Sequence, residues 1–381
     1  MSGPAAGILK LVWAEPIRNC ALHIDPIASK GRDNMTAKLA ARFAGQKETV
    51  DSVRQIDRDL YLMECRYDYR LDALLQKGAS NTADLFAKVS ANLFCGDSLP
   101  PLQDGGFACS AFDAYNENGD HLMGRNFDYK AAPVMALRCA PAGGYQSVAF
   151  VDCNFMACGY DRPRDKTGWR GALLAPFCCV DGINEKGLAI EVNELKTQAT
   201  AQRTGKTPVT TTLMIRAVLD KTATVEEALS LFRRYDMRAA FGVDYHFLLA
   251  DAGGRCALVE YIHNEMTVLY PEKHTEEGLP FLAVTNGYID PRGPAVKRPG
   301  GYRLRCLNET LTASGARLSE RECMDLLRRV QLRYRHKRGW PVVTLWSAVY
   351  NCNRRAVSLI AGDNDRDVFR FTVGREEWRT E

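Results

Sequence analysis

The chain has 381 residues, of which 46% are hydrophobic and 25% are charged, and this composition is typical of a globular protein with a sizeable core. A formal net charge of +4, from 50 basic and 46 acidic side chains, is too small to indicate a nucleic-acid-binding or membrane-surface protein. We therefore expect a small-molecule ligand. The length fits one large domain or two of ordinary size.

The first residues do not have the pattern of a signal peptide. They lack a basic segment, and the apolar run from Ile8 to Ala14 is interrupted by Lys10 and followed by Glu15 and Pro16. No stretch reaches the roughly 18 to 20 uninterrupted apolar residues that a membrane-spanning helix needs. We therefore predict a cytoplasmic protein.

Thirteen cysteines are present, but their odd number and irregular spacing do not indicate a disulfide framework. No pair has the Cys-x-x-Cys spacing of a zinc ribbon or a redox site. We expect most of them to be reduced core residues. They are Cys20, Cys65, Cys95, Cys109, Cys139, Cys153, Cys158, Cys178, Cys179, Cys256, Cys306, Cys323 and Cys352.

The segment before about residue 95 has a mainly helical pattern. Its clearest helix is predicted over Asn81–Phe94, where Leu85, Val89 and Leu93 recur at helical spacing behind an Asn/Thr cap. Residues 96–106 then contain three glycines and two prolines, which interrupt regular elements. This loop predicts a boundary between a helical leader, residues 1–108, and the rest of the chain.

After the loop, short apolar strands predict a β-hairpin. The strands Cys109–Tyr115 and His121–Asp128 flank a turn that contains Asn118-Gly119, a strong hairpin signal. If Tyr115 and His121 close the turn, Cys109 lies opposite Phe127, and Arg125 lies opposite Ala111 on the face of Cys109. The arginine would then lie near the sulfur.

The remaining pattern alternates strand groups with helices. Thr224 with Glu227, and Ser319 with Glu322, have the spacing of helix-capping boxes. This order predicts an α+β fold in which helices stack on antiparallel sheets. The predicted strands are Leu188–Asn193, His246–Asp251, Cys256–Ile262, Met266–Tyr270, Leu345–Tyr350, Ala356–Ile360 and Val368–Thr372, and the helices are Thr210–Leu219, Thr224–Tyr235 and Met324–Val330.

Cys109, at the start of the predicted hairpin, is a candidate nucleophile. Attack on an amide needs a thiolate, and a thiol with an ordinary pKa of about 8.5 is mostly protonated at neutral pH. A guanidinium lowers a thiol pKa, and a carboxylate can position a free α-amine as the base. Arg125 and Asp128 are three residues apart, so both serve one site only if the strand bends or ends near Asn126. His121 and His246 are expected to be structural.

Five segments, in order, resemble the choloylglycine hydrolase and penicillin V acylase family of linear-amide C–N hydrolases. The resemblance covers roughly residues 109–375 and includes spacings of 16 residues from Cys109 to Arg125 and 19 to Asp128. The segments are Cys109–Phe112, Gly124–Asp128, Asp181–Leu188, Ala283–Tyr288 and Tyr302–Arg305.

The resemblance implies a four-layer αββα N-terminal-nucleophile fold and a set of site residues. Cys109 would be the nucleophile, with Arg125 and Asp128 orienting its thiol and α-amine. Asn193 and Asn286 would supply oxyanion and α-amine hydrogen bonds, as neutral amide donors can. Arg303 would complete the polar network, although Arg305 competes for that role. No metal or organic cofactor is implied.

The long segment before Cys109 resembles the leaders of isopenicillin N acyltransferase and acid ceramidase. Those proenzymes cut themselves and keep the released piece as a small subunit. By this resemblance the bond Ala108–Cys109 is cut autocatalytically, giving chains 1–108 and 109–381. Gly105 and Gly106 would let the backbone adopt the approach that this step needs.

Two alternatives stay open at this point. The thioester could pass to an amine instead of water, which would make the protein an acyltransferase. A non-catalytic binding protein on the same fold could instead use the basic run from Arg328 to Arg338, for which a solvated helix end and loop is the simpler interpretation. The sequence also leaves open whether the chain forms a homo-oligomer and which amide is cleaved: a conjugated bile salt, penicillin V, an N-acyl amino acid or a fatty-acid amide.

Overall fold

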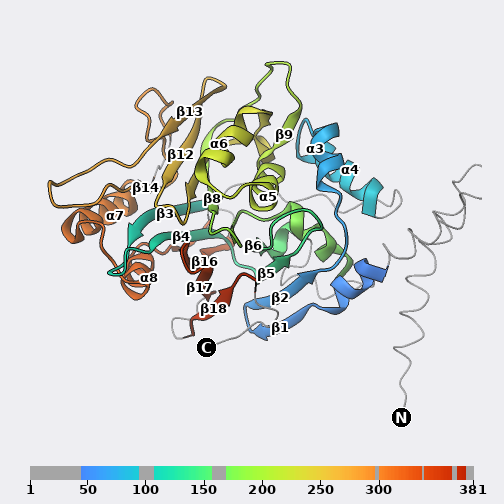
Figure 1. Cartoon of the computed structure of the whole chain (residues 1–381), viewed down its shortest axis with the longest axis horizontal. Coiled ribbons are helices and arrows are strands. Elements are labelled where there is room, and N and C mark those ends of the chain that lie inside the picture. The colour runs from blue at the N-terminus through green and yellow to red at the C-terminus, as the bar shows by residue number, and fades with distance from the viewer. Residues whose placement is uncertain are drawn as a thin grey trace, which may run out of the picture.

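The computed structural model describes residues 44–93, 107–156, 169–296, 300–336, 339–362 and 367–374. Gly105 and Gly106, which were predicted to let the backbone adopt the strained approach that cleavage needs, lie outside these residues, as do Cys20, Cys95 and Cys158. The described residues build two large β-sheets with helices on their outer faces (Figure 1).

The larger sheet has nine strands. All neighbouring strands in it are antiparallel except β2 and β5, which pair in parallel. In spatial order the strands are β1 (Arg54–Asp57), β2 (Leu60–Cys65), β5 (Val134–Cys139), β6 (Ser147–Asp152), β7 (Asp181–Asn184), β8 (Ala189–Gln198), β11 (Val243–Ala250), β12 (Cys256–Ile262) and β13 (Glu265–Leu269).

The second sheet has seven strands, all in antiparallel pairs. Its order is β14 (Ala283–Val284), β3 (Ala108–Tyr115), β4 (His121–Lys130), β16 (Pro341–Asn351), β17 (Ala356–Ala361) and β18 (Phe369–Thr372), with β15 (Arg333–Arg335) beside β16. A separate parallel pair is formed by β9 (Pro208–Thr210) and β10 (Asp236–Arg238).

Helices cover the outer face of each sheet. Helix α5 (Thr211–Lys221) contacts β7 and β8 of the nine-stranded sheet, and α6 (Val225–Arg233) contacts α5. Helices α7 (Gly301–Ser314) and α8 (Glu320–Arg329) contact strands of the seven-stranded sheet. The strand β3 contacts β8 and β11 across the interface between the sheets. The predicted α+β fold with four αββα layers is therefore confirmed.

Strand β3 is buried on both faces because its side chains alternate between two cores. Cys109 and Ala111 belong to the main core between the sheets. Phe112 and Ala114 belong to a second core, shared with residues of α7 and α8. The alternation directs the side chain of Cys109 toward the nine-stranded sheet.

The predicted register of the hairpin is confirmed. Tyr115 pairs with His121, Cys109 with Phe127, and Ala111 with Arg125. The turn has Gly119 at φ 80°, a left-handed conformation that glycine adopts without a steric cost.

The predicted helix at Asn81 is confirmed as α4 (Thr82–Leu93), and Ser319 with Glu322 forms a complete capping box. Thr224 caps α6 by accepting from the backbone nitrogen of Glu227. The basic run was predicted to be a helix end and loop, but the structure places a short exposed strand, β15, inside it. This strand forms because Arg333–Arg335 pairs with the start of β16.

The ten cysteines among the described residues are free thiols, and nine of them are buried, as expected for core residues. Among the described residues, no helix is both long and apolar enough to span a membrane.

The leader contributes strands as well as helices. Its described part contains a helix over residues 44–51, strands β1 and β2, α3 (Leu71–Lys77) and α4. The mainly helical pattern of this segment did not predict the two strands. Strand β2 pairs in parallel with β5, which needs a long crossover connection, and the chain between them supplies it.

Candidate active site

Cys109 lies at the start of β3 with no exposed surface. Its backbone nitrogen donates a hydrogen bond to Oδ1 of Asn286 at 3.0 Å. Its backbone oxygen accepts one from Nη1 of Arg303 at 2.7 Å. Side chains of the predicted site therefore bind the backbone nitrogen and oxygen of Cys109, which in an ordinary strand would pair with a neighbouring strand.

Arg303 connects three of the predicted residues from the first turn of α7. Besides the oxygen of Cys109, its Nη1 donates to Oδ2 of Asp128 at 3.0 Å, and its Nη2 donates to Oδ1 of Asn286 at 2.7 Å. Arg303 is buried, whereas Arg305 on the same helix is exposed. Of the two candidate arginines, Arg303 therefore lies in the hydrogen-bond network around Cys109, and Arg305 faces solvent.

Arg125 faces the nine-stranded sheet. Its Nε donates to Asp181 at 2.6 Å, and its Nη1 donates to Glu191 at 2.7 Å and to Oδ1 of Asn193 at 3.0 Å. Trp346 also donates to Asp181, at 2.9 Å. Two buried acidic side chains, from β7 and β8, therefore accept hydrogen bonds from the buried guanidinium.

Arg125 and Asp128 extend in different directions from one strand. Strand β4 continues to Lys130, so it does not end near Asn126. Arg125 reaches across to the nine-stranded sheet, whereas Asp128 reaches Arg303 of α7. The two side chains therefore extend from opposite faces of the strand, Arg125 toward the nine-stranded sheet and Asp128 toward α7.

Burial sets the protonation of the site. Burial raises the pKa of the Cys109 thiol to about 12, and the positive charge of Arg125 opposes this rise. Burial also raises the pKa of Asp128 to about 6 against the charge of Arg303, and that of Glu191 to about 7 against Arg125. In the intact chain the thiol is thus protonated at neutral pH.

Both predicted asparagines keep donor capacity. Nδ2 of Asn193 donates to Oε1 of Glu191 at 3.0 Å, and Nδ2 of Asn286 donates to the backbone oxygen of Glu194 at 2.9 Å. Each amide nitrogen carries two hydrogens, so each has one hydrogen besides the one donated in these bonds.

Phe107 anchors the chain just before the cleavage point that the sequence predicts. Its backbone nitrogen donates to Oε2 of Glu194 at 3.0 Å. Its ring, 1% exposed, stacks on Tyr245 at 5.7 Å between centroids and lies 5.0 Å from the ring of Phe127. These contacts fix the peptide that precedes Cys109.

All six predicted site residues are buried and joined by hydrogen bonds in two groups. Cys109, Asn286, Arg303 and Asp128 form one, and Arg125 and Asn193 belong to the other. Sequence reasoning missed the partners of these residues. The alternation in Glu191-Val-Asn193 places both side chains on one face, which was a usable signal for Glu191. The others are Asp181, which binds Arg125, Glu194, which binds Asn286, and Thr344, which binds Asp128.

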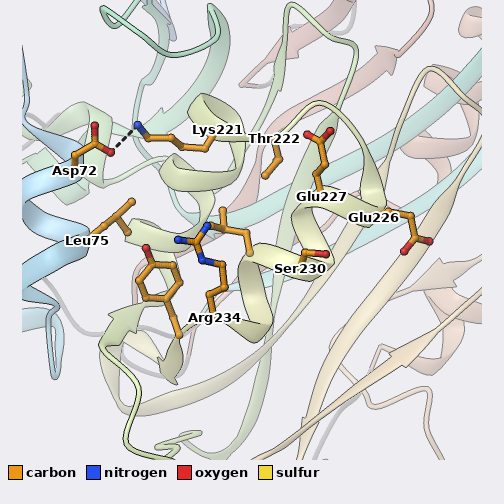
Figure 2. A pocket seen from close by; sticks show the side chains of 10 residues that line it. Asp72, Leu75, Lys221, Thr222, Glu226, Glu227, Ser230 and Arg234 are labelled. Carbon is orange, nitrogen blue, oxygen red and sulfur yellow. Dashed lines mark ion pairs between the residues drawn. The ribbon is translucent and has the colours of Figure 1, made fainter.

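A separate pocket of about 550 Å³ lies between α3 and α6. Figure 2 shows the ion pair between Lys221 and Asp72 at its edge, with a distance of 2.6 Å, and Arg234 and Glu227 on other walls. Its lining shares no residue with the site around Cys109. We give this mixed-charge pocket no role in the chemistry.

A model of the acyl-coenzyme A:6-aminopenicillanic acid acyl-transferase family matches residues 115–366 of the chain. A search of curated proteins finds no match.

Two kinds of solved structure are similar to this chain. A mutant of the conjugated bile acid hydrolase from Clostridium perfringens is 12% identical, with 71% of this chain and 94% of that chain covered and a TM-score of 0.47. Penicillin V acylase from Agrobacterium tumefaciens is 19% identical, with 69% and 86% covered and a TM-score of 0.48.

Proposed function

The chain belongs to the acyl-coenzyme A:6-aminopenicillanic acid acyl-transferase family, and on that basis we propose that it is an N-terminal-nucleophile amidohydrolase whose nucleophile is Cys109. It cleaves a non-peptide linear amide through an acyl-thioester. The nucleophile becomes a chain terminus when the bond Ala108–Cys109 is cut.

One observation carries this proposal. The backbone nitrogen of Cys109, an internal residue, is held by the side chain of Asn286, which also binds Arg303. An ordinary strand residue donates this hydrogen to a neighbouring strand. An α-amine that acts as a base needs the same kind of fixed acceptor, so the site is suited to a free amino group at residue 109.

The cutting step uses groups that the intact chain already places together. The sulfur of Cys109 attacks the carbonyl carbon of Ala108, the C–N bond breaks, and the nitrogen of Cys109 takes the thiol proton. The acyl group is then a thioester on Sγ. Water hydrolyses it, which leaves a carboxylate on Ala108 and a free α-amine and thiol on Cys109. Phe107 and Glu194 hold the peptide in place during the attack.

The mature reaction repeats this chemistry on a substrate. The α-amine of Cys109 takes the thiol proton, and the thiolate attacks the amide carbonyl. Asn193 and Asn286 donate to the oxyanion, and losing one such donor typically costs about 3 to 4 kcal/mol of barrier. The proton then passes to the leaving amine, and water releases the acyl group as an acid.

Intact-mass analysis of the purified protein tests the proposal. We expect two chains of residues 1–108 and 109–381 for the wild type and one uncut chain for Cys109→Ala. Cys323→Ala, which removes a buried thiol from α8, is the matched control and should be cut normally. A fully active protein that remains joined at Ala108–Cys109 would overturn the proposal.

An acyltransferase is the second candidate, because the family is named for one. In that case the thioester on Cys109 passes to an amine. Mature protein incubated with an acyl donor and a primary amine would then form the new amide faster than the free acid. A hydrolase would form the acid at a rate that the amine does not change.

The substrate can be identified by experiment. A panel of conjugated bile salts, penicillin V, N-acyl amino acids and fatty-acid amides, assayed for released amine, identifies the acyl and amine groups that are accepted. We place the reaction in the cytosol, in accord with free thiols at the ten described cysteines.

A further inference from the structure

The segment after β14 carries Asn286, and a buried histidine holds its first residue. Nε2 of His246, on β11, lies 2.8 Å from the backbone oxygen of Thr285. A carbonyl oxygen only accepts, so Nε2 donates this hydrogen bond. Nδ1 of His246 lies 3.0 Å from Oε1 of Glu260. Both ring nitrogens are occupied, which fixes the ring.

Glu260, on β12, holds the other end of the same segment. Its Oε1 accepts from the backbone nitrogen of Ile289 at 2.8 Å, and its Oε2 accepts from that of Asp290 at 3.0 Å. His246 and Glu260 are both 0% exposed. Together they bind three backbone groups of residues 285–290.

This pair also lies beside the second asparagine of the site. His246 and Asn193 are direct partners across β11 and β8, so their side chains lie on the same face of the sheet. The imidazole therefore touches the Asn286 segment on one side and neighbours Asn193 on the other.

Apolar side chains would fill this space at a lower desolvation cost than a buried histidine and glutamate. Only polar groups, however, can fix the carbonyl of residue 285 and the nitrogens of residues 289 and 290. The backbone on both sides of Asn286 is thereby held, and its Oδ1 lies 3.0 Å from the nitrogen of Cys109.

We propose that His246 and Glu260 are positioning residues, which hold the segment 285–290 so that Asn286 meets the backbone nitrogen of Cys109. This inference rests on the proposed function. Neither residue contacts the substrate in this role. A positioning role accounts for two buried polar side chains outside the predicted site that are directed at the loop that carries Asn286.

The rate of chain cleavage, followed by intact mass after synthesis in a cell-free system, tests the inference. We expect His246→Leu and Glu260→Gln to slow cleavage at least about tenfold, since a misplacement of about 1 Å can cost about 100-fold. His246→Gln keeps a side-chain N–H for the oxygen of Thr285 and should recover most of the rate.

His121 supplies a matched control. This buried histidine also bridges a carboxylate and a backbone carbonyl, those of Asp113 at 3.1 Å and Asp251 at 2.9 Å, but it does not bind residues 285–290. In urea unfolding, His121→Leu should lower the free energy of unfolding about as much as His246→Leu does. It should still be cut at close to the wild-type rate. Equal slowing by His121→Leu and His246→Leu would overturn the inference.

A second measurement separates this inference from the proposed function. If the wild type is not cut, the proposed function fails. Crystal structures of Cys109→Ala with and without His246→Leu still decide the positioning role. We expect Oδ1 of Asn286 to move out of hydrogen-bond distance of the nitrogen of residue 109 in the double variant. An unchanged Asn286 would overturn the inference.

Discussion

Arg303 shows at the scale of one residue how the site depends on a planar, forked cation. It donates to the oxygen of Cys109, to Asp128 and to Asn286 with two nitrogens. A lysine ammonium is a single point charge and cannot hold three acceptors in this arrangement.

We predict that Arg303→Lys slows cleavage of the chain by about 10-fold to 100-fold, because a hydrogen bond to a charged group contributes about 1.5 to 3 kcal/mol. The rate is measured by intact mass against time. Arg305→Lys, on the exposed side of the same helix, is the control and should be cut at the wild-type rate. Equal rates for both variants would contradict the role of Arg303.

Asp152 is a buried carboxyl outside the site whose titration affects stability. Burial raises its pKa to about 7, although hydrogen bonds from Asn154 oppose this rise. Between its ordinary pKa of 3.8 and about 7, the folded chain keeps a proton that the unfolded chain releases. Through this group, stability is therefore lost as the pH rises across that interval.

Release of this proton should lower the free energy of unfolding of the wild type between pH 4 and pH 7, by at most about 1.4 kcal/mol per pH unit. We predict that Asp152→Asn removes this contribution. Urea unfolding of the wild type and the variant at several pH values measures this difference. Parallel curves for the two proteins would show that the carboxyl does not titrate in this way.

The β3–β4 hairpin is the element that carries Cys109, and a close contact between its strands limits its sequence. Gly124 is the register partner of Phe112, and a Cβ at Gly124 would lie 2.4 Å from Cζ of that ring. Phe112 has no exposed surface, so its ring cannot move without disturbing the core under α7 and α8.

We predict that Gly124→Ala destabilises the protein by about 1 to 3 kcal/mol, the usual cost of overpacking a core. Thermal or urea unfolding in the Cys109→Ala background measures the change without interference from chain cleavage. Gly301→Ala is the control, because a Cβ there meets nothing within 4 Å and alanine favours the helix. A stability of Gly124→Ala equal to that of the control would contradict the contact.

At the scale of the whole molecule, the leader is part of the larger sheet. Its strand β2 pairs with β5 over Leu60–Cys65, and contacts made by side chains add to this. Tyr69 donates to Asp220 at 2.6 Å, and the ion pair of Asp72 with Lys221 appears in Figure 2. These contacts join residues on both sides of the proposed cut.

We therefore predict that the two chains stay together after cleavage. In size-exclusion chromatography under reducing, non-denaturing conditions they should elute in one peak, at the volume of uncut Cys109→Ala. Denaturant should separate them, because Cys65 and the other described cysteines are free thiols. A leader fragment that elutes alone without denaturant would show that the sheet contacts do not retain it.

The sequence by itself determined the local features of this protein. The Asn118-Gly119 turn and the alternation of apolar residues fixed the pairing of Cys109 with Phe127, because turn chemistry and a two-residue period are short-range properties. The capping box at Ser319 was readable for the same reason. The ordered motifs around Cys109 predicted the family and the αββα layers.

Only the tertiary structure decided what surrounds Cys109. It directed Arg125 toward Asp181 of the other sheet and Asp128 toward α7, and it buried Arg303 while leaving Arg305 exposed. It also added the leader to the sheet in parallel. These contacts join residues from 56 to 194 positions apart in the sequence, and no local period encodes them. They arise when two sheets and their helices pack together, which is where the chemistry of the site is assembled.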